Sequence, residues 1–232
     1  MTDAPSSRPL RILAAGAVKA VVQEIRGAFE TETARRLDVA FDTVGALRDR
    51  VLGGEPADVA ILSTQALDML ASRGLPHGDG ISLGRTGVAL GGRRGLAPVS
   101  IDTPERFRDL LLKAESIGYA DPERGATAGR HFRAVLDRMG LAEGVSGRLR
   151  MFSFGVDAIA ALGRGEVEIA VSQATEILTQ PDVVYLGPFP EPYGLTTAYG
   201  AVALSGDSGA QAFLARLASR EAAPILRRAG SF

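Results

Sequence analysis

The stretch that decides the fold reads Ile117-Gly118-Tyr119-Ala120-Asp121-Pro122-Glu123-Arg124-Gly125-Ala126-Thr127-Ala128-Gly129-Arg130-His131-Phe132. Its apolar start predicts a strand, Asp121-Pro122 predicts a turn, and an amphipathic pattern from Thr127 to about Met139 predicts a helix. The first N–H groups of a helix are unpaired and carry a partial positive charge, so a loop of small residues lets an anion approach them. The stretch therefore predicts an anion-binding helix start.

The rest of the chain alternates apolar and amphipathic runs, which predicts an α/β protein with mainly parallel sheets flanked by helices. Strands are expected at residues 10–15, 37–41, 57–62, 87–92, 117–120, 149–154, 168–171, 183–186 and 197–204. Helices are expected at residues 17–31, 46–52, 66–72, 127–139, 156–162, 208–218 and 222–228, and another starts at Pro104 with Thr103 as its cap. The pattern changes at Thr86, so we expect lobe 1 at 1–86 and 186–232, with lobe 2 inserted at 87–185.

Composition narrows the classes of function. The 232 residues carry a formal net charge of -1 and include no cysteine and two histidines, His77 and His131. We therefore expect no nucleic acid as a main partner, no membrane insertion, no disulfide, no metal centre and no cofactor. Walker, dinucleotide and nucleophile-elbow patterns are missing, which leaves nucleotide chemistry and acyl transfer unsupported. Residues 1–9 lack signal-peptide features, so the chain as written is expected in the cytoplasm, or in the periplasm if a signal peptide was removed.

Small and hydroxyl-bearing residues follow the predicted strands, where ligands sit in open α/β sheets. The candidate ligand-binding residues at these strand ends are Gly16, Ala17, Thr43, Val44, Ser63, Thr64, Thr127, Ala128, Gly129, Val156, Ser172 and Gln173. The serines and threonines among them are also natural helix caps.

Two cations, Lys19 and Arg130, fall in the first turns of predicted helices, where they oppose the helix dipole unless an anion lies between. The alternative is that they extend into solvent or pair with an acid such as Glu24 or Asp157. His131 is the candidate catalytic acid or base, because imidazole serves that role near neutral pH. A packed structural histidine is the alternative, and His77 is expected in a surface loop.

Five short segments together resemble the molybdate-binding-protein-like branch of the type 2 periplasmic binding proteins. They are Leu13–Ala17, Gly54–Val59, Ala120–Glu123 leading into Ala128-Gly129, Gly165–Val171 and Ala222–Gly230. The resemblance implies two lobes, a hinge of crossing strands, and an oxyanion or carboxylate held between them. It also implies ligand hydroxyls at the positions of Ala17, Val44 and Ser172, and backbone donors at Ala128 and Val156.

The replacement of hydroxyl-bearing residues by Ala17 and Val44 disfavours molybdate, because each lost hydrogen bond costs about 1–3 kcal/mol. The segments Gly16–Lys19, Ala128–Phe132 and Gly187–Pro190 instead resemble the aconitate isomerases. We expect a di- or tricarboxylate in an interlobe cleft, and proton transfer in that ligand is an open question. The alternative is the binding component of an importer for molybdate or another oxyanion, with a transporter permease as partner if the chain is exported.

Overall fold

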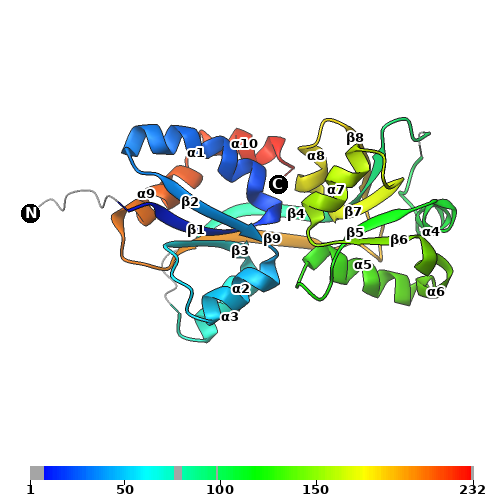
Figure 1. Cartoon of the computed structure of the whole chain (residues 1–232), viewed down its shortest axis with the longest axis horizontal. Helices are drawn as coiled ribbons and strands as arrows, with labels where there is room; N and C mark the ends of the chain where they lie inside the picture. The colour runs from blue at the N-terminus through cyan, green and yellow to red at the C-terminus, as the bar shows by residue number, and fades with distance from the viewer. Residues whose placement is uncertain (1–7, 76–79, 98, 231–232) are drawn as a thin grey trace, which may run out of the picture. The chain divides into compact units, whose positions relative to one another are not determined.

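The chain divides into two units, and it passes between them within two long strands (Figure 1). The computed structural model describes residues 8–75, 80–97 and 99–230. Unit 1 comprises the chain up to Arg85 and from Ala198 onward, and unit 2 comprises Thr86–Thr197. The chain leaves unit 1 within β4 (Ile81–Arg93) and returns within β9 (Thr196–Ala203).

The expected lobe boundary at residue 186 differs from this division, which keeps residues 186–197 in unit 2. Strand β8 (Val183–Pro188) explains the difference, because it pairs antiparallel with β4. The carbonyl of Leu195 then accepts a hydrogen bond from the backbone N–H of Val88 at 2.9 Å. Such long-range pairing has no local sequence signal.

Unit 1 is built on the sheet order β2-β1-β3-β9. Its strands β1 (Leu10–Ala15), β2 (Leu37–Asp42) and β3 (Val59–Ser63) are parallel, and β9 is antiparallel to β3. The helical elements are η1 (Gly16–Val18), α1 (Lys19–Thr33), α2 (Val44–Leu52), α3 (Thr64–Ser72), α9 (Ser208–Leu217) and α10 (Ala222–Arg228). Phe29 of α1 and Phe213 of α9 pack edge to face on one side of the sheet, and Leu47 and Leu67 of α2 and α3 fill the other.

Unit 2 repeats this plan with the order β4-β7-β5-β6, and β8 lies on the other side of β4. Strands β5 (Ile117–Ala120), β6 (Leu149–Phe152) and β7 (Ile169–Gln173) are parallel, and β4 is antiparallel to β7. The helical elements are α4 (Pro104–Lys113), α5 (Thr127–Arg138), α6 (Ala142–Val145), η2 (Ser146–Arg148), α7 (Gly155–Gly163) and α8 (Ala174–Leu178). Phe107 and Phe132 of α4 and α5 pack on one face, and Ile159 and Ile177 of α7 and α8 pack on the other.

The predicted mainly parallel α/β architecture is confirmed, and so is the predicted cap of α4. Thr103 Oγ1 accepts from the Arg106 N–H at 3.3 Å, and Pro104 occupies the first turn, where its missing N–H costs nothing. The helix expected from residue 17 begins as the 3₁₀ turn η1 and becomes α-helical at Lys19. The short helices α6 and α8 were not predicted, because four or five residues are too few to show a helical period.

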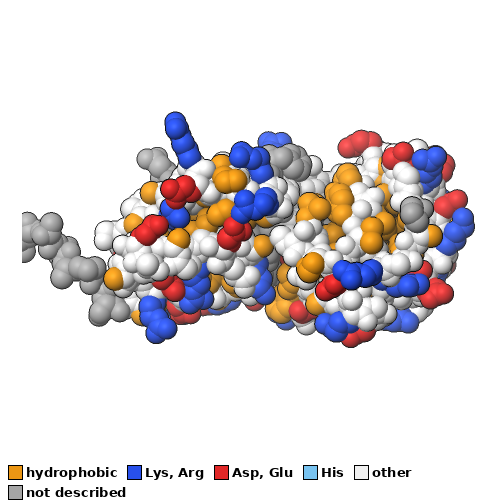
Figure 2. All heavy atoms as spheres, turned by 90° about the horizontal axis from the view of Figure 1, so that it is seen from above, with side chains coloured by type: hydrophobic (Ala, Val, Ile, Leu, Met, Phe, Trp, Pro, Cys, Tyr) orange, Lys and Arg blue, Asp and Glu red, His pale blue; other side chains and the backbone are white. Residues whose placement is uncertain are grey.

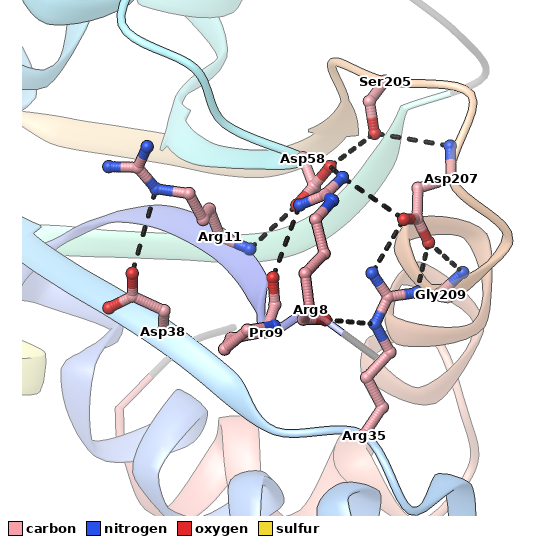
Figure 3. A network of polar contacts seen from close by, with 9 residues as sticks. All are labelled: Arg8, Pro9, Arg11, Arg35, Asp38, Asp58, Ser205, Asp207 and Gly209. Atoms are coloured by element: carbon pink, nitrogen blue, oxygen red, sulfur yellow. Dashed lines mark hydrogen bonds and ion pairs between the residues drawn. The ribbon is translucent and has the colours of Figure 1, made fainter. Parts of the chain in front are cut away.

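A network of polar contacts stabilises unit 1 at the amino ends of β1 and β3 (Figure 3). These ends lie opposite the strand carboxyl ends. Both oxygens of the buried Asp58 carboxylate accept from the Arg8 guanidinium at 2.7 Å, and one also accepts from Ser205 Oγ at 2.7 Å. Arg35 holds Asp207 in a second pair, which adjoins Arg8. Burial alone would raise the pKa of Asp58, but the hydrogen bonds from Arg8, the Arg11 backbone and Ser205 outweigh it and lower the pKa to about 2.

Acidic and basic side chains alternate on the face in Figure 2, in keeping with the net charge of -1. Hydrophobic side chains also gather on the part of this face that belongs to unit 2. In unit 2, Leu178 of α8 and Val184 and Tyr185 of β8 are 40–45% exposed.

Candidate functional site

In unit 1, the residues at the carboxyl ends of the strands begin the following helices. Thr43 Oγ1 accepts from the Ala46 N–H at 3.1 Å, and Ser63 Oγ accepts from the Ala66 N–H at 3.3 Å. Thr43 therefore caps α2 and Ser63 caps α3. Helix capping was the alternative role expected for these residues from the sequence. The Ser63 hydroxyl accepts one bond in this cap and can still donate another, so it remains chemically able to meet a ligand. Thr64 is exposed in the first turn of α3, and Gly16 and Ala17 form η1.

Two cations, Lys19 and Arg130, were predicted to bind the ligand. Lys19 Nζ lies 5.7 Å from the centre of the Phe41 ring, a cation–π contact. Arg130 is exposed in the first turn of α5. Neither cation forms an ion pair within the described parts of the chain, and Glu24, proposed as one acid partner, pairs with Arg228 instead. Each unit therefore has, near a helix start, one cation that forms no ion pair within the described residues.

The start of α5 in unit 2 packs closely against the end of β5. Ala126 supplies no side-chain cap, so the first N–H groups of the helix at Thr127 and Ala128 have no side-chain acceptor at that position. A Cβ on Gly129 would lie 2.9 Å from the carbonyl carbon of Ala120 and closer still to the oxygen. The first turn of α5 is thus pressed onto the end of β5, which only glycine at position 129 permits.

Gln173, at the end of β7, is the most informative residue of this edge. Its side chain is 4% exposed, and neither its amide nitrogen nor its amide oxygen has a hydrogen-bond partner among the described residues. The hydroxyl of the neighbouring Thr175, which is 3% exposed, also lacks one there. Buried polar groups without partners cost about 1–3 kcal/mol each, so they are rare away from functional sites.

The sheet register places Gln173 on the same face as α5. Side chains alternate along a strand, and Val171 packs in the core cluster that contains Ala128 and Phe132. Val88, the antiparallel partner of Gln173, belongs to that cluster as well. Along the sheet, Ile117 pairs with Ile169, so Gln173 lies one residue beyond the end of β5. The Gln173 amide and the start of α5 therefore occupy one corner of unit 2, which we call the α5 corner.

Ser172 and Glu176 form a second polar group, at the start of α7. Ser172, which is fully buried, donates a hydrogen bond from Oγ to Glu176 Oε2. A Cβ on Gly155, the first residue of α7, would lie 2.5 Å from the same carboxylate oxygen. An internal carboxylate therefore lies against the helix start where Val156 was predicted to donate to a ligand.

The sequence reading missed Glu176, Thr175 and Arg124 at this edge. Arg124 lies over the ring of Phe154, the residue that precedes α7, at 4.8 Å from its centre. The four-residue spacing of Ser172 and Glu176 was the available signal for their contact, but it has meaning only if a helix follows β7 at once. That helix, α8, was not predicted from the sequence.

His131 lies in the second turn of α5 and is half-buried. Its Nε2 is 2.7 Å from the backbone carbonyl oxygen of Tyr193. Because a carbonyl only accepts, Nε2 carries the proton in this contact, and in the neutral ring Nδ1 then holds the lone pair. The catalytic role of His131 stays a prediction, and His77 lies outside the described residues.

Among residues 8–75, 80–97 and 99–230, no three His, Asp or Glu side chains come together as metal ligands would. None of the helices in the same ranges is long and apolar enough to cross a membrane.

Comparison with known proteins places this edge in context. Residues 10–231 match the sequence profile of a family described as bacterial extracellular solute-binding proteins. An aconitate isomerase from Pseudomonas sp is 29% identical over 231 residues, covering 95% of this chain and 86% of that protein. The periplasmic molybdate-binding protein of Azotobacter vinelandii superposes with a TM-score of 0.77 at 15% identity, covering 96% and 98% of the two chains. PEB3 with bound L-phospholactate superposes with a TM-score of 0.68 at 14% identity, covering 95% and 98%.

Proposed function

Because the chain belongs to the family of bacterial extracellular solute-binding proteins, we propose that it binds a small di- or tricarboxylate and shifts a double bond in that ligand by proton transfer. The binding part of the proposal comes from the chemistry of the site residues. The reaction part comes from the similarity to an aconitate isomerase.

The binding proposal rests on the α5 corner, where the side-chain amide of Gln173 has no hydrogen-bond partner among the described residues. A ligand carboxylate at this corner accepts from Gln173 Nε2 and from the first N–H groups of α5, whose partial positive charge favours an anion. Binding thus removes the cost of the buried amide nitrogen. Arg130 in the same helix turn adds a fork of donors suited to a second carboxylate.

The residues of unit 1 favour a polycarboxylate over a compact oxyanion. Ala17 and Val44 offer no hydroxyl, and Ala17 is 9% exposed while Val44 packs partly into the core. A tetrahedral oxyanion that loses its water needs a donor for each oxygen. Lys19, with no ion pair in the described part of unit 1, offers a positive charge to a carboxylate at the start of α1.

The reaction needs one proton to move within the ligand. A base removes a proton from the CH₂ carbon next to a carboxylate, the double bond shifts by one position, and a proton returns to the carbon at its other end. His131 is the proposed acid and base, because its Nε2–H is held by the Tyr193 carbonyl and its Nδ1 keeps the lone pair. Cationic donors at the ligand carboxylate stabilise the negative charge that develops.

The second candidate function is the binding component of an importer for molybdate or another oxyanion. The description of the family as extracellular favours it. In that role the chain would work outside the cytoplasmic membrane and deliver its ligand unchanged to a transporter permease. The fold of the Azotobacter vinelandii protein is compatible with this role, and ligand preference separates it from the first proposal.

Calorimetric titration tests the binding proposal. We expect trans-aconitate, cis-aconitate or citrate to bind the wild-type chain saturably and more tightly than molybdate. Gln173→Ala should weaken carboxylate binding by about 10–100-fold, since it removes a buried donor to a charged group. Gln180→Ala, which changes an exposed glutamine in the same unit, is the matched control and should bind as the wild type does. Tighter binding of molybdate than of every carboxylate would favour the importer reading.

A further inference from the structure

The start of α7 already holds a carboxylate that belongs to the chain. Phe154, at the N-cap position, has no side chain that could cap the helix. Glu176 reaches this point from α8, and its Oε2 accepts the hydrogen bond of the buried Ser172 hydroxyl. Gly155 lies so close to both side chains that a Cβ there would collide with them.

These contacts put Glu176 in the place that a ligand anion would take. A carboxylate is stabilised at a helix N-terminus by the partial positive charge of the free N–H groups. The same carboxylate accepts the hydrogen bond of the buried Ser172 hydroxyl. A second anion at this helix start would meet a like charge and would find the hydroxyl donor already occupied.

We propose that Glu176 is a specificity-determining residue, which fills the anion position at the start of α7 and so directs the ligand carboxylate to the α5 corner. This inference rests on the proposed carboxylate binding. A free oxyanion at the start of α7 would have to displace the Glu176 carboxylate from the Ser172 hydroxyl.

The proposal predicts that removing the carboxylate creates a new anion site. In Glu176→Ala, the start of α7 and the Ser172 hydroxyl become open to a free anion of similar size. Acetate or molybdate should then raise the melting temperature of the variant with the logarithm of concentration, on the order of 3–6 °C for each tenfold rise above Kd. Sodium chloride at equal ionic strength corrects for general salt effects.

Three further chains make the test decisive. The wild type and Glu143→Ala, which removes an exposed carboxylate of the same unit, should respond to acetate and molybdate less than Glu176→Ala does. Glu176→Gln should give an intermediate response, because its side chain still fills the position but no longer carries the negative charge.

The inference is overturned if acetate and molybdate shift Glu176→Ala no more than Glu143→Ala. If Glu176→Ala does not fold, Glu176→Gln decides the question by ligand preference. Loss of the negative charge should then reduce the preference for trans-aconitate over molybdate at least several-fold, and an unchanged ratio would overturn the inference. A wild-type chain that binds no carboxylate would instead refute the proposed function, so the two failures differ.

Discussion

Gly129→Ala should lower the free energy of unfolding by about 3 kcal/mol or more, which corresponds to a fall in melting temperature of about 6–12 °C. A Cβ at this position would enter the carbonyl group of Ala120. Neither side can yield cheaply, because Ala120 is the last residue of β5 and Gly129 lies in the first turn of α5. The helix start must move, so carboxylate binding at the α5 corner should weaken together with stability.

Urea denaturation of the wild type and the variant measures this loss. Gly27→Ala is the matched control, because Gly27 lies inside α1 and a Cβ there would meet nothing within 4 Å. That control should be stabilised by about 0.5–1 kcal/mol through helix propensity. A loss for Gly129→Ala no larger than about 1 kcal/mol would show that the packing of α5 on β5 tolerates a side chain.

Asp58→Asn should lower the free energy of unfolding by about 2 kcal/mol at neutral pH. Asp58 is 2% exposed, and its pKa is lowered from 3.8 to about 2. A lowered folded-state pKa means that the charged form stabilises the fold. This stabilisation is complete above about pH 5 and is lost as the pH falls toward 2. The amide of asparagine cannot offer Arg8 two charged acceptors.

Urea denaturation from pH 7 down to pH 2 gives both the size and the pH dependence. The stability difference between wild type and Asp58→Asn should be constant from pH 7 to about pH 5 and should shrink below that. Asp68→Asn, an exposed position on α3 in the same unit, should show almost no difference at any pH. A difference for Asp58→Asn that persists unchanged at pH 2 would mean that the ionised carboxylate does not carry the effect.

The secondary structure was largely predictable, because its signals are local. The cap of α4 depends on Thr103 and Pro104 alone, and the alternation of strands and helices follows from the spacing of apolar residues. The expected boundary at residue 186 differs from the division into units because β8 pairs with β4 about ninety residues earlier in the chain. Register of this kind depends on contacts that no short window contains.

The candidate site was predictable in position but only partly in chemistry. Thr43, Ser63 and Gln173 could be placed at strand ends from the sequence, yet only the structure distinguishes two capping hydroxyls from an amide without a partner. Glu176 required both the overlooked helix α8 and the fold of unit 2 to bring it to Gly155. Polar side chains acquire their roles from three-dimensional partners, which is why spacing alone did not identify this one.

Proton transfer in a bound polycarboxylate is the central claim, and solvent deuterium tests it most directly. Trans-aconitate and cis-aconitate are incubated separately with the wild-type chain in heavy water and followed by proton NMR. We predict conversion between the two isomers, with deuterium entering the carbon next to a carboxylate at a rate that rises with protein concentration. No conversion and no deuterium uptake above the buffer control, for either isomer at saturating concentration, would contradict the claim and leave a protein that only binds.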